Sequence, residues 1–391
     1  MGSVVMIPYG RQDICDDDIE AVIQVLRSDF LTQGPVVPNF EKNVSGYCGA
    51  GFGIATNSAT SALHIACLAL DLGQDDWLWT SPTSFVASSN CGLYCGAKVD
   101  FVDIDPRTYN LSLEALEDKL IVAEKNGTLP KVVIPVHLCG QSCDMAGIHS
   151  LGNKYGFRII EDASHAVGGK YKNEPIGSCK YSDITIFSFH PVKIITTGEG
   201  GMALTNNPML AEKMKKYRSH GLTSNSIEME ARPNEEIWNY QQVTLGYNYR
   251  MTDIQASLGN SQMKRLDEFV EKRHQIARRY ELELTDNLQK PWQHPETYSS
   301  YHLYPICINQ DKYAIAQKEA YSNLQTAKIN VNLHYIPIYR QPYYESMGFK
   351  AGYCPVAEHY FRSALSIPMY PSLREEEHAK VITVINRIFS P

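Results

Sequence analysis

The sequence predicts an α/β fold with a mostly parallel sheet, followed by a smaller α+β domain. Short apolar runs alternate with segments of helical periodicity from residue 52 to residue 205, a pattern typical of parallel sheets. The chain has 391 residues, and one core usually divides beyond roughly 250–300 residues. We therefore expect a large domain over residues 1–265, and a smaller domain over residues 266–391 on which the extreme N-terminus is able to pack.

The first elements are predicted as follows. The helical spacing of Ile19, Val22 and Leu26 predicts a helix over residues 16–26, and the turn Leu31-Thr32-Gln33-Gly34-Pro35 follows it. Residues 52–56 have the composition of a strand. The run Asn57-Ser58-Ala59-Thr60-Ser61-Ala62 has the small hydroxyl residues of a helix N-terminus. Further strands and helices are predicted over residues 77–80, 87–94, 99–104, 111–121, 132–136, 148–155, 158–160, 184–187 and 202–205.

The rest of the chain is predicted to be mainly helical. Helices are expected over residues 208–219 and 252–262, and a charged stretch over residues 262–288 could link the two domains. A strand over residues 303–308, a helix around residues 314–325, a further segment over residues 331–334 and a last helix over residues 375–388 indicate the smaller domain.

Composition limits the class of protein. An apolar content of 43% and a charged content of 20% are ordinary for globular proteins, and the net charge of −7 predicts no binding to nucleic acid or to an anionic membrane. No segment reaches the ~18 uninterrupted apolar residues of a membrane span. The ten cysteines have no spacing of zinc ligands or of a small secreted domain. We expect a cytoplasmic protein with reduced thiols and no metal.

A single lysine stands between a predicted strand end and a glycine-rich turn. Lys193 follows Ser188-Phe189-His190-Pro191-Val192 and precedes Thr196-Thr197-Gly198-Glu199-Gly200-Gly201. Glycine lets the backbone approach a ligand closely, and burial lowers the pKa of a lysine so that its amine can attack an aldehyde. We interpret Lys193 as an imine-forming residue, and the alternative is a solvated surface lysine.

A carboxylate and an imidazole follow another predicted strand. The apolar residues 157–160 end in Glu161-Asp162-Ala163-Ser164-His165-Ala166, and ligands of open α/β sheets bind at the carboxyl ends of strands. Asp162 could therefore partner the nitrogen of a pyridine ring, with His165 near the same ligand. The alternatives are that Asp162 caps a helix and that His165 is a packed histidine.

Other residues have the chemistry of a phosphate and ring site. The N–H groups of Ala59 and Thr60 at the helix start, with the hydroxyls of Thr60 and Ser188, could bind phosphate. Phe85 could stack on a pyridine ring or belong to the core. An acid, an amine and a phosphate cradle on successive strand ends describe a pocket for pyridoxal 5′-phosphate (PLP).

These motifs together resemble the DegT/DnrJ/EryC1/StrS family of sugar aminotransferases over nearly the whole chain. The resemblance implies a fold-type I PLP-dependent transferase, similar to aspartate aminotransferase. The motifs that carry it are Leu31-Thr32-Gln33-Gly34, Asn57-Ser58-Ala59-Thr60-Ser61-Ala62-Leu63, Glu161-Asp162-Ala163-Ser164-His165-Ala166, Ser188-Phe189-His190 with Lys193, Thr197-Gly198-Glu199-Gly200-Gly201 and Gly246-Tyr247-Asn248-Tyr249-Arg250-Met251.

The resemblance also implies roles for single residues. Lys193 is implied as the Schiff-base lysine, Asp162 as the partner of the ring nitrogen, and Thr60 and Ser188 as phosphate ligands. Asn248 is implied to reach the phosphate of a neighbouring subunit, so an obligate homodimer is expected. Some family members carry His in place of the lysine and dehydrate sugars, so Lys193 favours transamination.

A narrower resemblance concerns the substrate. Four motifs resemble the branch of the family that acts in pseudaminic acid synthesis: Ser188-Phe189-His190, Arg218-Ser219-His220-Gly221, Ser300-Tyr301-His302-Leu303-Tyr304-Pro305-Ile306 and His334-Tyr335-Ile336-Pro337-Ile338-Tyr339. The resemblance implies transfer of the amino group of L-glutamate to C4 of a UDP-linked 2-acetamido-2,6-dideoxy-4-keto-hexose. The product would be UDP-4-amino-4,6-dideoxy-N-acetyl-β-L-altrosamine.

Three candidates for substrate contacts follow from this branch. His334 and Tyr339 are candidates to contact the sugar nucleotide, and Arg250 could bind a carboxylate or pyrophosphate, although each could instead be structural. One alternative function is amination of another keto sugar, dTDP-linked or with a C3 ketone. Another is a PLP-binding regulator without turnover, which the intact Lys193 and Asp162 disfavour.

Overall fold

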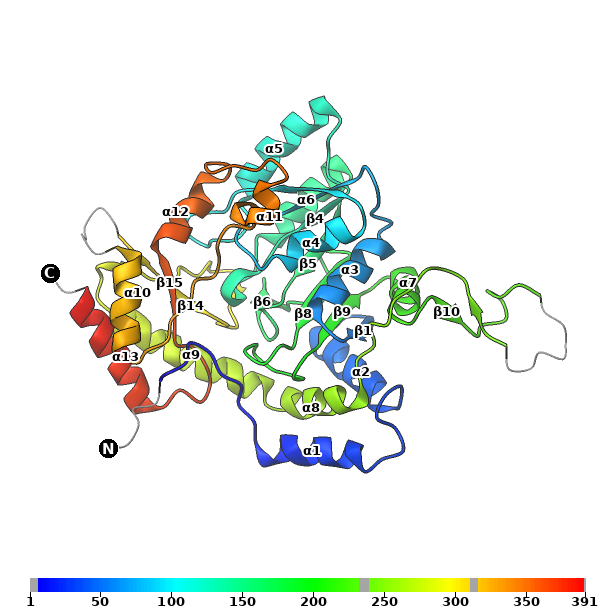
Figure 1. The fold of residues 1–391 in the computed structure, drawn as a ribbon, viewed down its shortest axis with the longest axis horizontal. Coiled ribbons are helices and arrows are strands. Elements are labelled where there is room, and N and C mark those ends of the chain that lie inside the picture. Colours follow the sequence, from blue (N-terminus) through cyan, green and yellow to red (C-terminus); the bar gives the residue numbers. More distant parts are fainter. Residues whose placement is uncertain (1–5, 232–238, 310–315, 390–391) are drawn as a thin grey trace.

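A seven-stranded sheet forms the centre of the molecule, whose computed structural model describes residues 6–231, 239–309 and 316–389 (Figure 1). The strand order is β1-β9-β8-β5-β4-β2-β3. Pairs from β8 to β3 are parallel, whereas β9 is antiparallel to both of its neighbours, so the predicted mostly parallel sheet is confirmed. The strands are β1 (Phe52–Thr56), β2 (Trp77–Thr80), β3 (Lys98–Phe101), β4 (Val132–Ile134), β5 (Arg158–Asp162), β8 (Ile184–Ser188) and β9 (Gly201–Thr205).

Both faces of the central strands are buried, which explains their nearly continuous apolar sequence. Every residue of β8 and β9 is buried. Ile186 and Ala203 pack into one core, whereas Phe187 and Met202 pack into the core on the opposite face. Successive side chains of a strand point to opposite faces, so each strand contributes to both cores.

Helices cover the two faces. In the first core lie α3 (Ala59–Ala69), α4 (Ala87–Tyr94) and α7 (Pro208–Arg218). In the second lie α2 (Val36–Cys48) and the start of the α8–α9 pair, α8 (Asp253–Met263) and α9 (Leu266–Glu283). Three further helices are α1 (Asp16–Leu26), which packs along α8, and α5 (Leu113–Asn126) and α6 (Met145–Tyr155), which pack with the outer strands.

Most of the C-terminal elements, together with part of α9, surround a separate core. The helices Pro342–Glu345 and Pro355–Ser363 pack instead into the first core, beside the central sheet. A three-stranded antiparallel sheet has the order β12-β14-β15. Ile7 forms a bridge with Ile329 in this part. The division of the chain near residue 265 remains a prediction. The elements are β12 (Leu288–Gln289), β14 (Tyr304–Ile308), β15 (Ala364–Ile367), α10 (Gln317–Thr326), α11 (Pro342–Glu345), α12 (Pro355–Ser363) and α13 (Glu375–Ile388), with short 3₁₀ turns at Leu138–Gly140 and Ile338–Arg340.

Some elements differ from the predictions. Residues 331–334 form no strand, and Asn332 makes only an isolated bridge to Ser366. The helix expected from residue 314 begins at Gln317, and residues 314 and 315 lie outside the described residues. The sequence patterns also missed helix α2 and three short strands, β6 (Lys170–Tyr171), β7 (Glu174–Pro175) and β13 (Thr297–Tyr298). A further pair that they missed, β10 (Leu222–Thr223) and β11 (Gln241–Gln242), forms a hairpin that projects from the body of the molecule in Figure 1.

The start of α2 depends on a residue far along the chain. Asp253, at the beginning of α8, accepts hydrogen bonds from the backbone N–H groups of Gly34 at 2.6 Å and of Val36 and Val37 at 2.9 Å. A carboxylate that accepts from the first N–H groups of a helix stabilises its start. Because this carboxylate comes from another helix, local sequence patterns could not indicate where α2 begins.

All ten cysteines are free thiols. Over the described residues, His, Cys, Asp and Glu side chains form no group of three or more suited to hold a metal ion. In the same part of the chain, no helix combines the length and apolar character that crossing a bilayer would require.

Candidate active site

The carboxyl ends of β5 and β8 open into a cavity of about 620 Å³. The N-terminus of α3, the turn before β9 and residues 332–336 also line it. The cavity therefore brings together segments from both halves of the chain. The predicted site residues that line it are Ala59, Thr60, Phe85, Asp162, His165, Ser188, Lys193 and His334.

Lys193 is half-buried in the loop that joins β8 to β9. Its N–H donates to the carbonyl of His190 at 2.9 Å, which forms a turn at the strand end. Burial lowers the pKa of Lys193 to about 8, although the negative charge of Asp162 opposes this shift. A substantial fraction of the amine is therefore neutral near pH 8, which is the form that attacks an aldehyde.

Asp162 is the last residue of β5 and is buried. Its Oδ2 accepts a hydrogen bond from Oγ of Ser88 at 2.6 Å, and its Oδ1 accepts from the N–H of Ser164 at 3.1 Å. Its backbone N–H donates to Pro135, and its carbonyl accepts from the N–H of His137. The two side-chain bonds fix the carboxylate at the cavity wall rather than at the start of a helix, and the two backbone bonds hold the end of β5.

The N-terminus of α3 has the geometry of an anion site. Ala59 and Thr60 occupy the first two helical positions, and Ser58 caps the helix by accepting from the N–H of Ser61 at 3.1 Å. The first N–H groups of a helix have no acceptor within it. A β-carbon at Gly201 would lie 2.5 Å from the nitrogen of Ala59, so only glycine allows β9 to begin this close to the helix.

Two further predicted residues, Ser188 and Phe85, line the cavity. Ser188 ends β8, where it pairs with Gly201, and is buried. Phe85 lies in the loop before α4 and is 60% exposed, so it is a lining residue and not a core residue. An exposed aromatic face at a cavity is available for stacking.

Three neutral histidines form one wall of the cavity. Burial and the nearby charge of Lys193 hold the pKa of His165 well below its usual range. Burial, together with His165 and Lys193, does the same for the pKa of His302. Burial and Lys193 lower the pKa of His334 to about 3. The rings of His165 and His302 pack with centroids 4.4 Å apart, so the wall presents imidazoles without positive charge.

Three predicted residues do not line the cavity. Asn248 is exposed and bridges to Ser219, and its contact with a neighbouring subunit stays a prediction. Arg250 is half-buried and bridges to Thr56. Tyr339 is fully buried, and its hydroxyl donates to Glu358 at 2.6 Å. The structure therefore gives no support to a direct contact between Tyr339 and a ligand in this cavity.

The sequence analysis did not assign three residues that the structure places at the site. His302 lies in the Ser300 to Ile306 motif, and Tyr335 follows His334, so both stood in motifs that were noted only for their resemblance. Ser88 lies in α4, and nothing in its sequence context indicated that it would contact Asp162. Its role depends on the packing of α4 against α3, β2 and β3, which brings Ser88 to the end of β5.

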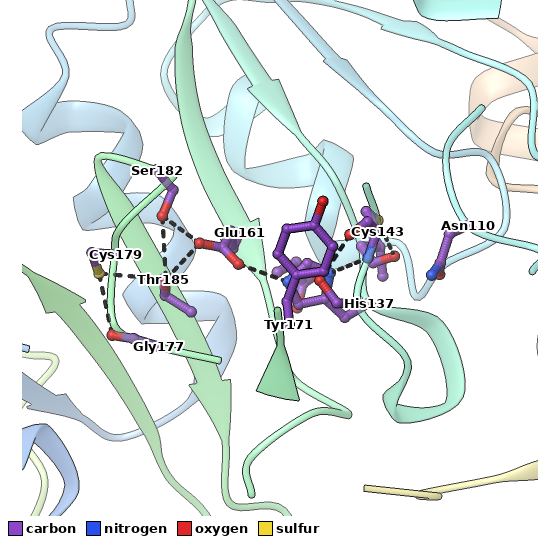
Figure 2. A network of polar contacts seen from close by, with 12 residues as sticks. Asn110, His137, Cys143, Glu161, Tyr171, Gly177, Cys179, Ser182 and Thr185 are labelled. Atoms are coloured by element: carbon purple, nitrogen blue, oxygen red, sulfur yellow. Dashed lines mark hydrogen bonds and ion pairs between the residues drawn. The ribbon is translucent and has the colours of Figure 1, made fainter. Parts of the chain in front are cut away.

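A buried polar network lies around Glu161, the neighbour of Asp162 in β5 (Figure 2). Nε2 of His137 lies 2.7 Å from Oε2 of Glu161, and Nδ1 of His137 accepts from the N–H of Cys143 at 3.1 Å. Because Nδ1 accepts, Nε2 carries the proton that is shared with Glu161. Burial alone would raise the pKa of Glu161, but hydrogen bonds from His137, Ser182 and Thr185 outweigh it and lower the pKa. Glu161 is therefore a paired, buried carboxylate beside Asp162.

Comparison with known proteins identifies the family. The model of the DegT/DnrJ/EryC1/StrS aminotransferase family matches residues 12–386. The chain belongs to this family. It is 37% identical over 370 residues to the UDP-4-amino-4,6-dideoxy-N-acetyl-β-L-altrosamine transaminase of Campylobacter jejuni, covering 94% of this chain and 93% of the relative. It is 34% identical to the spore coat polysaccharide biosynthesis protein SpsC of Bacillus subtilis, covering 98% and 97%.

Solved structures agree with this family. Helicobacter pylori PseC, an aminotransferase involved in the biosynthesis of pseudaminic acid, superposes with a TM-score of 0.88 at 30% identity, covering 98% of this chain and 99% of PseC. The expected fold of a PLP-dependent transferase is thereby confirmed. As a member of this family, the protein is a PLP-dependent aminotransferase.

The cavity fits this cofactor. Lys193 supplies an amine for the aldehyde, Asp162 supplies a fixed carboxylate for the ring nitrogen, and Ala59 and Thr60 supply free N–H groups for the phosphate. The donor set therefore matches the aldehyde, the ring nitrogen and the phosphate of PLP.

Proposed function

We propose that the enzyme transfers the amino group of L-glutamate to C4 of a UDP-linked 2-acetamido-2,6-dideoxy-4-keto-hexose. The product is UDP-4-amino-4,6-dideoxy-N-acetyl-β-L-altrosamine, and the reaction belongs to pseudaminic acid biosynthesis. The names of the Campylobacter jejuni relative and of Helicobacter pylori PseC support this substrate. The observation that carries the proposal is the placement of the Lys193 amine and the Asp162 carboxylate in one cavity.

Lys193 and Asp162 take the central roles. When bound, PLP supplies an electrophilic carbon and a ring that withdraws electrons from the substrate. Lys193 holds the cofactor and, with its pKa near 8, accepts and returns a proton at the substrate carbon. Asp162, fixed by Ser88 and Ser164, keeps the ring nitrogen protonated.

Other lining residues bind and orient the ligands. Ala59, Thr60 and Ser188 hold the phosphate, and Phe85 stacks on the ring. The wall of neutral imidazoles suits an uncharged sugar rather than an anionic group, and the ring nitrogens of His165 and His334 already contact protein atoms. These uncharged side chains cannot form an ion pair with a carboxylate of L-glutamate. A cation outside this wall is therefore needed, and Arg250 is the candidate.

Assembly and location form part of the same proposal. We place Asn248 at the phosphate of the partner subunit in a homodimer, which its exposure permits. Apolar side chains on the β10–β11 arm support burial in such an interface, since Tyr240 is 65% exposed and Leu245 is 73% exposed. The free thiols are consistent with the cytoplasm as the location.

A different keto sugar is the second candidate. The Bacillus subtilis relative is named for spore coat polysaccharide biosynthesis, and this name specifies neither pseudaminic acid nor a UDP-linked sugar. The purified enzyme would be given L-glutamate and a panel of UDP- and dTDP-linked keto sugars, with NMR of each product. We expect amination at C4 of the UDP-linked 4-keto sugar. Amination of only a dTDP-linked sugar, or at C3, would replace the first proposal with the second.

A further inference from the structure

A hydrogen bond joins the two halves of the chain inside the cavity. Oη of Tyr335 lies 3.2 Å from Nε2 of His165. Their rings are stacked, with centroids 6.2 Å apart and planes 21° apart. His165 follows β5, whereas Tyr335 belongs to the C-terminal part of the chain, and both residues line the cavity with Lys193.

The direction of this bond follows from the other nitrogen of His165. The backbone N–H of Cys139 donates to Nδ1 of His165 at 3.2 Å, so Nδ1 carries a lone pair. Burial and Lys193 keep the pKa of His165 low, so the ring is neutral and has one proton. That proton must be on Nε2, and His165 therefore donates to the oxygen of Tyr335.

The hydroxyl proton of Tyr335 is not used in the hydrogen bond with His165. Burial raises the pKa of Tyr335, with Cys139 and Asp162 adding to the shift, so the side chain is a phenol. Its oxygen accepts from His165, and across the described ranges no protein acceptor is found for its proton. Since Tyr335 is half-buried and lines the cavity, the proton is available to a bound molecule.

Packing holds this donor in place. His302 packs on the ring of His165, and Oγ of Ser300 donates to the carbonyl of His165 at 2.8 Å. On the other side, the hydroxyl of Tyr360 donates to the carbonyl of His334 at 3.0 Å, next to Tyr335. A donor that is oriented before binding loses little freedom when a ligand arrives.

We propose that Tyr335 donates a hydrogen bond to an oxygen atom of the molecule held against Lys193, and that His165 is a positioning residue that acts through Tyr335. The inference rests on the proposed function for the identity of that molecule. The oxygen belongs either to the ring of PLP or to the keto sugar, and the two sources give different results when Tyr335 is changed.

The test uses Tyr335→Phe in the full-length enzyme, with Tyr280→Phe as control. Tyr280 also loses a buried hydroxyl, which donates to Pro368 at 2.8 Å, but it does not line the cavity. If the oxygen belongs to PLP, Tyr335→Phe weakens PLP binding about tenfold and shifts the pH titration of the visible absorbance. If it belongs to the sugar, PLP binding is unchanged and the KM for the sugar rises about tenfold.

Tyr280→Phe should change neither PLP binding nor the KM for the sugar. The proposal is overturned if Tyr335→Phe matches Tyr280→Phe in both measurements. The PLP measurement needs no sugar, and the KM is measured with whichever nucleotide sugar the wild-type enzyme aminates. Failure of the substrate assignment is therefore distinguishable from failure of the Tyr335 assignment.

The role of His165 is tested by two substitutions. His165→Gln keeps an N–H donor toward Tyr335, whereas His165→Leu removes it. We expect His165→Leu to reproduce the defect of Tyr335→Phe, His165→Gln to restore most of it, and the double variant His165→Leu with Tyr335→Phe to be little worse than either single variant. Additive losses in the double variant would show that His165 acts independently of Tyr335 and would overturn its positioning role.

Discussion

Oγ of Ser88 lies 2.6 Å from Oδ2 of Asp162, so helix α4 supplies a donor to the carboxylate at the end of β5. A hydrogen bond to a charged group contributes about 1.5–3 kcal/mol. We expect Ser88→Ala to lower kcat about tenfold or more, because the ring nitrogen of PLP then has a less firmly held partner. Ser89→Ala is the matched control, since Ser89 contacts Tyr344 and not Asp162. Equal kinetics of the two variants would show that the hydroxyl of Ser88 does not contribute to catalysis.

Lys193 should be the residue that PLP modifies. Borohydride reduction of the PLP-loaded enzyme, followed by peptide mass mapping, should find the pyridoxyl group on Lys193. Lys193→Ala should bind PLP without a covalent bond and lose turnover, because no other lysine is among the residues that line the cavity, all of which lie in the described part of the chain. A Lys193→Ala enzyme with the wild-type rate would refute this role.

The pH dependence of PLP uptake should report the pKa of Lys193. The neutral amine reacts, so the rate at which the apoenzyme takes up PLP should rise with pH and level off above about 8. The charge of Asp162 raises the pKa of Lys193, so Asp162→Asn should move the midpoint to lower pH. The visible absorbance at a series of pH values measures both profiles. A midpoint that stays the same in Asp162→Asn would contradict the coupling.

Gly201→Ala should displace the start of α3. The added β-carbon would lie 2.5 Å from backbone atoms of Ser58 and Ala59, which cannot move without shifting the helix. We expect a lower melting temperature and weaker PLP binding, measured by thermal unfolding and by titration. Gly46→Ala in α2 is the control, because a β-carbon there meets nothing within 4 Å and alanine favours the helix. Unchanged PLP affinity in Gly201→Ala would argue against a phosphate at this position.

The hydrogen bonds around Glu161 in Figure 2 should contribute to the free energy of unfolding of the protein. His137→Phe leaves the Glu161 carboxylate buried without its main partner, and breaking a buried pair in this way costs about 3–5 kcal/mol. Glu161→Gln removes the charge but keeps hydrogen-bonding groups for His137 and Ser182, so the loss should be smaller. Urea unfolding of both variants measures the difference. A larger loss in Glu161→Gln would show that the charge itself stabilises the fold.

Sequence patterns were sufficient to assign a role to residues whose surroundings are determined by their neighbours along the chain. Asp162 ends the buried strand β5 and Lys193 lies in the loop that follows β8, so both line the cavity at the edge of the sheet. Residues placed by tertiary packing could not be assigned in this way. Ser88 reaches Asp162 only because α4 packs near β5, and Tyr335 meets His165 across 170 residues of chain. Tyr339 shares a motif with His334, yet its 3₁₀ turn directs it to Glu358.

The reversed direction of β9 restricts how the lysine loop can vary. Because β8 and β9 pair antiparallel, the segment that carries Lys193 is a hairpin connection tied at Ser188 and Gly201. A crossover helix could absorb an inserted residue by adding part of a turn, whereas an insertion here falls between the paired ends Ser188 and Gly201. One inserted or deleted residue would move the amine relative to the helix start that faces Gly201. Loop length should therefore be almost invariant among relatives that keep the lysine, even where the loop sequence drifts.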